Sequence, residues 1–274
     1  MIDTHCHLWF ENFKGEVPQV VARAKEAGVH TLICVGCDEE SSHQSVEIAG
    51  QYDNVYAAVG VHPTEVKLVQ GSVLNQRLSM LWLSELIRSS KKIVAIGETG
   101  LDYFHQPFDR ELQMKFFKEH CLIAQEFDLP VIVHLRATKE SKAFSKELTA
   151  VEKDCFTVLD GVGMKPGKVL FHCFSGDRTM AEEVLKRGWH LSFSGVLTFP
   201  RAEELREVVK MCPLDRMVVE TDSPFLAPNS KRGQRNESAY VVEVAQLIAE
   251  LKGISCRDVG RNLDKNAEDL FGLR

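Results

Sequence analysis

The chain has 274 residues, of which 44% are hydrophobic and 26% are charged, and its formal net charge is −6. This composition supplies enough apolar material for a substantial core and argues against disorder. The negative charge argues against non-specific wrapping of long duplex DNA, which depends mainly on Lys and Arg, although bound divalent ions would reverse the sign locally.

The N-terminus lacks the basic and apolar regions of a secretory signal, and no apolar run approaches the roughly 18 residues of a membrane span. The eight cysteines are scattered, which favours reduced thiols in a cytoplasmic protein with no membrane partner. Cys34 and Cys37 form a CxxC pair without a second pair, so we interpret them as core residues. The sequence is compatible with a monomer and leaves the oligomeric state open.

Short apolar runs alternate with longer amphipathic stretches along the chain. The runs predict strands at 1–8, 30–36, 54–60, 92–97, 130–135, 168–173, 189–194 and 216–221. Apolar residues spaced i, i+3, i+4 and i+7 predict helices that include 18–28, 73–90, 109–128, 179–188 and 202–212. The alternation is typical of βα units around a parallel sheet, and eight strands suit a barrel, although an open doubly wound sheet would show the same pattern.

The fold we predict is α/β, a single (β/α)8 TIM-type barrel whose active site lies at the C-terminal ends of the strands. No repeat, low-complexity tract or linker divides the chain, so residues 1–274 are interpreted as one domain. The stretch 227–239 predicts one long loop after the last strand.

Histidines and carboxylates recur where the predicted strands end. Side chains two residues apart leave the same face of a strand, so His5 and His7 could hold one metal ion together. Four more such residues, one for each of four later strands, are Glu98, His134, His172 and Asp222. Structural histidines would scatter over both ends of a barrel, whereas the shared position favours a metal site.

This set of residues also suits particular cations. Imidazoles and carboxylates fit zinc, manganese, nickel or iron better than magnesium, which prefers an all-oxygen shell. Six ligands are too many for one tetrahedral site, so they divide naturally into two sites that share a carboxylate, with the ions ~3.5–4 Å apart. We therefore predict two divalent metal ions and leave their identity open.

Six motifs occur in the order DTHCHL, GVHP, GETGLDY, VHLRA, FHCFSG and ETDSPFLAP over residues 3–228. In this order they resemble the successive motifs of the TatD-type metal-dependent deoxyribonucleases, a family of amidohydrolase-like barrels. The loop SKRGQRNE also resembles the RGKRNEP segment of that family, with Gln234 in place of the usual lysine and Ser238 in place of the usual proline.

The resemblance implies a division of the six ligands between two ions. His5 and His7 would hold the first ion, His134 and His172 would hold the second, and Glu98 would bridge both. Asp222 would complete the first site and face the bridging water. The resemblance also implies cleavage of DNA, often from the 3′ end.

Two of the six residues are predicted to be catalytic. Two cations bind the phosphate oxygens and activate a water molecule between them, and Glu98 would bridge these cations. Asp222 is our candidate for the general base that accepts the water proton and passes it to the leaving oxygen.

Further residues could bind the substrate or support the ligands. His62 and Arg136 lie close to the strand ends, although His62 could cap the loop before Pro63 and Arg136 could pair with Glu140. The basic loop with Lys231, Arg232 and Arg235 could steer DNA or could simply be solvated. Glu220 could orient an imidazole ligand, and Tyr103 and Phe104 could stack a terminal base or be buried.

Three hypotheses follow from the sequence. The first is two-metal hydrolysis of DNA phosphodiester bonds, exonucleolytic in the 3′–5′ direction on single-stranded or terminal DNA. The second keeps the barrel and the ions but hydrolyses a small amide, lactone or phosphoester. The third is a non-catalytic metal-binding scaffold, which nothing in the sequence favours.

Overall fold

The computed structural model of the protein describes residues 1–66, 80–138 and 147–273. Its eight strands form one sheet in chain order, and every neighbouring pair is parallel. The strands are β1 (Ile2–Cys6), β2 (Thr31–Val35), β3 (Val55–Val59), β4 (Ile93–Asp102), β5 (Val131–Arg136), β6 (Val169–Phe171), β7 (His190–Phe193) and β8 (Met217–Val219). The predicted eight-stranded α/β barrel is confirmed.

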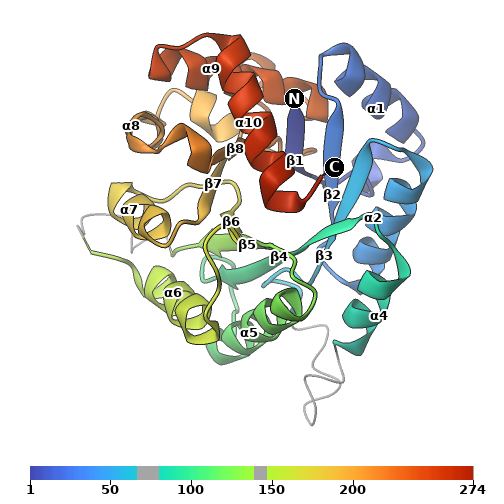
Figure 1. The fold of residues 1–274 in the computed structure, drawn as a ribbon, viewed down its shortest axis with the longest axis vertical. Helices are drawn as coiled ribbons and strands as arrows, with labels where there is room; N and C mark the ends of the chain where they lie inside the picture. The colour runs from blue at the N-terminus through green and yellow to red at the C-terminus, as the bar shows by residue number, and fades with distance from the viewer. Residues whose placement is uncertain (67–79, 139–146, 274) are drawn as a thin grey trace.

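The first and last strands meet through the segment that follows β8. The backbone N–H of Asp222 donates to the carbonyl of His5 at 2.9 Å, and the N–H of His7 donates to the carbonyl of Ser223 at 2.8 Å. These bonds close the ring of strands that Figure 1 shows. The open doubly wound sheet is thereby excluded.

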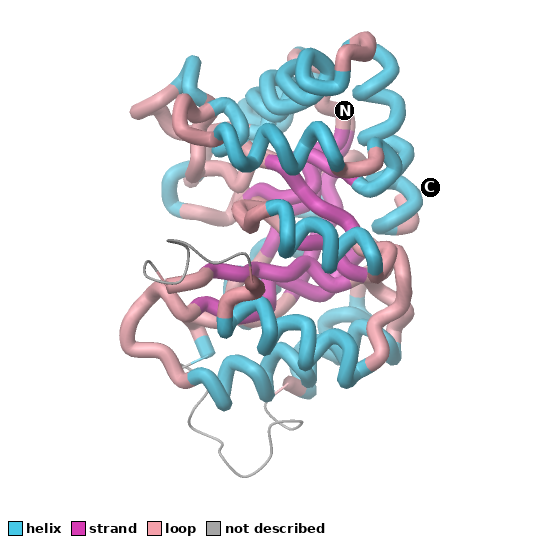
Figure 2. Tube along the Cα trace, turned by 90° about the vertical axis from the view of Figure 1, so that its left-hand side faces the viewer, coloured by secondary structure: helices cyan, strands magenta, loops and turns pink. Residues whose placement is uncertain are grey.

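Helices surround the strands, as Figures 1 and 2 show. They are α1 (Val17–Glu26), α2 (Glu39–Gln51), α4 (Leu81–Ser89), α5 (Arg110–Glu126), α6 (Ala150–Val162), α7 (Arg178–Lys186), α8 (Glu203–Met211), α9 (Val241–Lys252) and α10 (Cys256–Phe271). The predicted helices at 18–28, 109–128, 179–188 and 202–212 correspond to α1, α5, α7 and α8. Of the predicted helix at 73–90, residues 73–79 lie outside the described residues.

Local sequence sets the ends of several helices. Asp38 begins α2 with a capping box, because its side chain accepts from the N–H of Ser41 while the Ser41 hydroxyl accepts from the N–H of Asp38. Thr149 and Glu152 form the same arrangement at α6. That helix ends at Gly163, whose φ of 77° is the left-handed conformation that glycine adopts without a Cβ penalty.

The interior of the barrel is filled by small and branched side chains. Residues from five different strands pack in one cluster with the C-terminal end of α10, namely Ile33, Ala95, Ile132, Leu170, Val218, Leu270 and Phe271. Side chains from strands across a ring can touch only inside it, so this cluster is the barrel core. Because Ile2 at the start of β1 belongs to the same cluster, α10 covers the end of the barrel where strands begin. The opposite end is left for the site.

The loop after β8 is more ordered than the sequence predicts. Two 3-10 turns, η5 (Asn229–Lys231) and η6 (Ser238–Tyr240), lie within it, and further turns are η1 (Glu11–Phe13), η3 (Gly195–Thr198) and η4 (Leu214–Arg216). The buried Asn236 amide donates to the carbonyls of Thr221 and Phe225 at 2.8 and 2.6 Å. The loop is therefore anchored to the segment that carries Asp222.

All eight cysteines fall among the described residues and are free thiols. Within the described ranges, no helix combines the length and the apolar character that crossing a bilayer requires.

Candidate metal centre

The six predicted ligands come together at one end of the barrel. His5 lies in β1, Glu98 in β4 and His134 in β5, while His7 and His172 follow β1 and β6 and Asp222 follows β8. Glu98 and three of the histidines are buried, and His134 and Asp222 are half-buried. Residues from five separate strands thus converge at one end of the barrel, as the positions at the strand ends predict.

The two oxygens of Glu98 face different pairs of histidines. Oε1 lies 2.8 Å from Nδ1 of His134 and 2.7 Å from Nε2 of His172. Oε2 lies 3.3 Å from Nε2 of His5 and 3.9 Å from Nε2 of His7. One carboxylate therefore contacts two separate imidazole pairs, which is the arrangement that a bridging ligand requires.

Asp222 lies on the side of the first histidine pair. Its Oδ1 is 3.3 Å from Nε2 of His7 and 3.8 Å from Nε2 of His5. The backbone at Asp222 has a φ of 59°, a conformation that costs energy for most residues other than glycine and that aspartate tolerates better than most. Its N–H bond to the His5 carbonyl helps to hold the carboxylate beside both imidazoles.

The residues fit divalent cations. Ligand atoms lie within 4.8 Å of one another in four groups: His5, His7 and Asp222; His5, Glu98 and His172; His7, Cys37 and Glu98; and His62, Glu98 and His134. Mixed imidazole and carboxylate donors suit first-row transition metals and zinc. His5 Nδ1 is a buried ring nitrogen with no hydrogen-bond partner among the described residues, and the other imidazoles would offer a lone pair to a cation once they lose a proton.

Two further carboxylates hold the second histidine pair. Asp102 Oδ2 lies 3.1 Å from Nε2 of His134, and Glu220 Oε1 lies 3.2 Å from Nδ1 of His172. Both carboxylates are fully buried. Each imidazole thus has one nitrogen on Glu98 and the other on an outer carboxylate, the kind of contact that fixes the ring of a metal-binding histidine.

Sequence reasoning proposed Glu220 for such a contact but missed Asp102. The signal is present in GETGLD, where Glu98, Gly100 and Asp102 occupy alternate positions. Because β4 continues to Asp102 rather than ending at 97, the carboxylates of Glu98 and Asp102 both reach the imidazole of His134.

Mutual electrostatics set the protonation of the centre. Burial raises the pKa of Glu98, but the neighbouring His172, His62 and His134 outweigh it and hold the pKa well below its usual range. Burial lowers the pKa of His172, but Glu98 and Glu220 raise it well above its usual range. For His5, burial dominates and the pKa is lowered. Cations must therefore displace protons, so metal binding will release protons.

His62 lies within this centre rather than at its rim. Its Nε2 is 3.5 Å from Oε1 of Glu98, and its ring stands edge-on to that of His134 with the centroids 4.3 Å apart. Nδ1 lies 2.7 Å from the hydroxyl of Thr64. His62 thus belongs to a candidate metal group with Glu98 and His134 while it also contacts the loop that follows β3.

Cys37 is placed differently from the sequence interpretation. Cys34 is buried in the core as predicted, but Sγ of Cys37 lies 3.9 Å from Nδ1 of His7 and belongs to one of the candidate metal groups. The Nδ1 of His7 lies closer, at 2.8 Å, to the carbonyl of Val35. Cys37 therefore lies beside the first histidine pair, and core packing alone does not describe it.

The arginines predicted to bind the substrate differ in exposure and in their partners. Arg136 is exposed and its guanidinium lies 4.1 Å from the ring centroid of Phe104. Its alternative partner, Glu140, lies outside the described residues. Arg232 is also exposed, with its guanidinium 5.4 Å from the ring of Phe199. Both charges are accessible to a polyanion.

Arg235 is instead bound to the protein. Its guanidinium donates to the carbonyl of Asn12 at 2.5 Å and to the carboxylate of Glu16 at 2.8 Å, and it covers the ring of Phe13. This residue ties the loop after β8 to the segment before α1. Its predicted role as a substrate contact is therefore weaker than that of Arg232.

Tyr103 is unavailable for base stacking. Its ring is 5% exposed, stacks on Phe108 with centroids 4.7 Å apart, and donates its hydroxyl proton to Asp154 at 2.7 Å. Phe104 is half-buried and one of its neighbours is the guanidinium of Arg136. Of the two predicted roles, stacking of a base or burial in the protein, Tyr103 therefore has the second.

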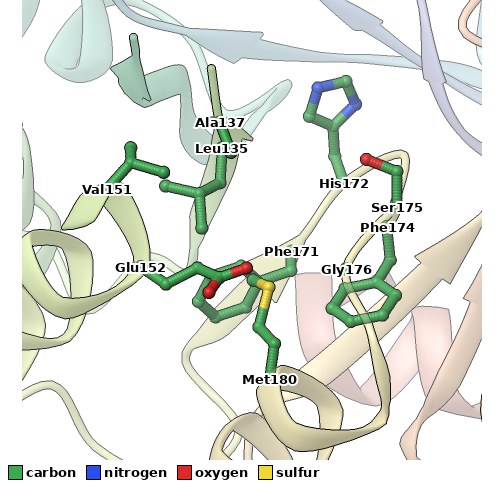
Figure 3. Close-up of a pocket in the computed structure, with 10 residues that line it drawn as sticks. All are labelled: Leu135, Ala137, Val151, Glu152, Phe171, His172, Phe174, Ser175, Gly176 and Met180. Atoms are coloured by element: carbon green, nitrogen blue, oxygen red, sulfur yellow. The ribbon is translucent and has the colours of Figure 1, made fainter. Parts of the chain in front are cut away.

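A cleft opens next to the second histidine pair between the ends of β5 and β6. Figure 3 shows its lining, in which His172 lies at one edge with its imidazole directed away from Glu152 and Met180. Phe171 and Phe174 supply apolar walls. The metal centre is thus bordered by a partly apolar recess.

The fold and the site define a barrel hydrolase with a metal centre at its strand ends, and comparisons with known proteins agree. The sequence profile of the family described as "TatD related DNase" matches residues 2–272. The "uncharacterized metal-dependent hydrolase" YabD of Bacillus subtilis is 35% identical, with 100% of this chain and 99% of YabD covered. YcfH of Escherichia coli K12, described in the same words, is 35% identical, with 100% and 96% covered.

A solved structure extends the comparison. The crystal structure of YjjV, a TatD homologue from Escherichia coli K12, superposes with a TM-score of 0.87 at 29% identity and covers 100% of this chain and 98% of YjjV. This chain belongs to the TatD-related DNase family of metal-dependent hydrolases.

Proposed function

We propose that the protein hydrolyses DNA phosphodiester bonds with two divalent ions and acts as a 3′–5′ exonuclease on single strands or strand ends. The observation that carries the proposal is the division of the four histidines between the two oxygens of Glu98. Such a carboxylate suits a pair of cations rather than one. The DNA substrate is suggested by the family to which the chain belongs.

Each ion would have its own ligands. We assign His5, His7 and Asp222 to the first site and His134 and His172 to the second, with Glu98 in both. Bound cations of this kind bind phosphate oxygens and make a water molecule acidic enough to attack near neutral pH.

Within this arrangement the chain's own groups would move the proton. Asp222 is held beside His7, and its pKa is lowered because the hydrogen bond from His7 and the charges of the histidines outweigh burial, so it is ionised and can accept a proton. The attacking water forms a bond to phosphorus while the bond from phosphorus to the leaving sugar oxygen breaks. The proton taken by Asp222 then passes to that oxygen.

Other residues would bind and orient. Asp102 and Glu220 hold the imidazoles of His134 and His172 in place. His62 would contact the phosphate, and the exposed Arg136 and Arg232 would attract the strand. A cytoplasmic location is part of the proposal, since eight free thiols suit a reducing compartment.

The test begins with metal-free protein to which manganese, zinc, cobalt, nickel, iron or magnesium is restored singly. Oligonucleotides labelled at the 3′ or the 5′ end then report the direction of cleavage. Progressive loss of the 3′ label before the 5′ label is expected, with no cleavage by the His134→Ala variant. Cleavage that survives both chelation and this substitution would remove the DNA assignment.

The same preparations separate the alternative hypotheses. A panel of small amides, lactones and phosphoesters should be hydrolysed far more slowly than oligonucleotides. A preference for one of these small substrates would replace the nuclease proposal, and metal-loaded protein inactive on the whole panel would favour a binding role.

A further inference from the structure

Three aromatic side chains lie together beside the first histidine pair, and we call them the aromatic patch: Trp9, Phe10 and Phe225. The Trp9 and Phe225 rings have their centroids 5.8 and 6.3 Å from that of His7. The Phe10 centroid lies 5.0 Å from Trp9 and 5.2 Å from Phe225. The four rings therefore form a closed circuit in which each contacts two others.

The patch is fixed by the same groups that fix the metal centre. The carbonyl of Val35 accepts from Nε1 of Trp9 at 2.7 Å and lies 2.8 Å from Nδ1 of His7. A single backbone oxygen therefore positions both a proposed ligand and an aromatic ring. Because the ring is already held, a partner that lies against it would cost little ordering entropy.

The backbone of Phe225 is held at both of its polar atoms. Its N–H donates to the carbonyl of Asp222 at 2.9 Å, and its own carbonyl accepts from the buried Asn236 amide at 2.6 Å. The tight turn from Asp222 thus fixes the backbone of Phe225 relative to the proposed base, and the ring contacts His7 and Phe10 from there. The ring follows the metal ligand by three residues and does not pack into the core.

Exposure marks Phe225 as a contact surface. The residue is 45% exposed, whereas Trp9 and Phe10 are half-buried. An aromatic ring kept in water at the rim of a polar centre gains little for the stability of the fold. When another planar group stacks on such a ring, the contact stabilises the complex.

We propose that the aromatic patch, and Phe225 above all, stacks the nucleobase adjacent to the scissile phosphate. This inference rests on the proposed nuclease function. A nucleobase is one sugar away from its phosphate, so a phosphate at the metal centre places a base within reach of a ring 6.3 Å from His7. Stacking needs no particular base edge, so it is tolerant of sequence.

The patch would also select the state of the strand. In a duplex the bases are already stacked on their neighbours and paired, and one of them must leave the helix to reach Phe225. An unpaired end has no such penalty. The aromatic patch thus favours single strands and frayed ends, as a specificity-determining surface rather than as part of the chemistry.

The experiment removes aromaticity from the substrate and from the protein in turn. Oligothymidylates carry 5,6-dihydrothymine, which keeps the hydrogen-bonding edge but loses the planar aromatic ring, at one of the last three positions of either end. Stacking on an aromatic side chain corresponds to about 5- to 150-fold in affinity, so for wild type we expect at least about a five-fold lower kcat/KM at one position. For Phe225→Ala, the kcat/KM on plain oligothymidylate should fall by the same factor, and dihydrothymine should cause no further change. Phe225→Tyr should still cleave the dihydrothymine substrate more slowly than plain oligothymidylate.

Controls address folding and generality. Phe225→Leu keeps apolar bulk without a ring and should behave like the alanine variant while retaining metal content and melting temperature. Leu122→Ala removes a comparably exposed side chain from α5 and should change nothing. Equilibrium binding of the same oligonucleotides to metal-loaded protein, followed by fluorescence anisotropy, gives a readout that does not require cleavage.

The outcomes separate the two proposals. Two results overturn base stacking by Phe225 and leave the nuclease function standing: cleavage that ignores dihydrothymine at every position, or a loss of kcat/KM on dihydrothymine that is equal in wild type and Phe225→Ala. Base-dependent binding without cleavage supports the patch and removes the nuclease function. If the protein neither cleaves nor binds oligonucleotides, both proposals are overturned.

Discussion

The buried carboxylate of Asp102 lies 3.1 Å from Nε2 of His134, on the opposite side of the imidazole from Glu98. The ring is therefore held between two carboxylates, one that faces the metal centre and one behind it. A second contact, from Asp102 Oδ2 to Nδ1 of His105 at 2.8 Å, fixes the Asp102 carboxylate in turn.

Asp102→Asn should weaken metal binding at the second site alone. The amide keeps the shape but loses the charge that orients the His134 ring, and such changes cost about 10–100-fold in metal affinity. Competition with a chelating dye measures the two affinities. Asp154→Asn removes a buried carboxylate that pairs with Arg110 and should leave both affinities unchanged. Equal losses at both sites in Asp102→Asn would contradict a role through His134.

Glu98→Gln should weaken both ions, because each of the two carboxylate oxygens contacts a different histidine pair. His172→Gln should weaken only the second ion. Elemental analysis after dialysis is expected to give less than one metal per chain for the first variant and about one for the second. Indistinguishable metal contents in the two variants would be incompatible with a bridging role for Glu98.

Arg232→Gln should reduce the salt dependence of oligonucleotide binding. An exposed cation that neutralises one phosphate contributes about 0.7 to the slope of log affinity against log salt for a single strand. Arg235→Gln should change the slope less, since the guanidinium is already paired with Glu16. Anisotropy titrations over a range of salt concentrations test this difference, and a larger effect from Arg235 would reverse our ranking of the two arginines.

Gly100→Ala should destabilise the fold at β4. An added Cβ would lie 2.1 Å from the carbonyl oxygen of His134, and the φ of 140° is one that alanine rarely adopts. We expect a loss of about 3 kcal/mol or more in the free energy of unfolding by urea. The matched control is Gly260→Ala in α10, where nothing lies within 4 Å and a gain of about 0.5–1 kcal/mol is expected.

His120 should make the fold sensitive to acid. It is fully buried, with Nε2 accepting from the N–H of Val61 and Nδ1 2.7 Å from the carbonyl of Phe116, and burial lowers its pKa to about 4. The unfolded chain, with a pKa of 6.5, takes up the proton first. Stability therefore falls as the pH drops from about 6.5 to about 4 and levels off below, by about 3 kcal/mol in total.

The comparison for this effect is metal-free wild type against His120→Gln, whose amide can still accept from Val61. Urea unfolding at several pH values should show a shallower acid loss in the variant. Because the other histidines titrate alike in both proteins, their contributions cancel in the difference. Parallel pH profiles would show that His120 does not carry this sensitivity.

The sequence predicts the parts of the site that depend on position along the strands. Apolar runs followed by His134, His172 or Asp222 are local patterns, and parallel strands in a closed barrel bring such residues to one end. Asp102 was not predicted to contact His134, because that contact requires β4 to continue past Glu98 to residue 102. The glycines of this segment have positive φ, and by their intrinsic propensity they predict the end of a strand.

Other features depend on contacts that no local pattern encodes. Cys37 reaches His7 because β1 and β2 are neighbours, and Arg235 reaches Glu16 across most of the length of the chain. The clustering of Trp9 and Phe225 likewise arises from the meeting of the first and last strands. Composition and spacing carry no information about such pairs until the barrel is closed.

That closure has a consequence for cation loading. The hydrogen bonds from Asp222 to His5 and from His7 to Ser223 join the two ends of the sheet, and they involve three of the four residues that we assign to the first ion. An ion bound at the first site would link residues on both sides of the junction of β1 and β8 and stabilise it. Chelation should therefore speed amide hydrogen exchange at the N–H groups of His7 and Asp222 more than in the rest of the barrel. Loss of the first ion would then be coupled to opening of the junction between β1 and β8.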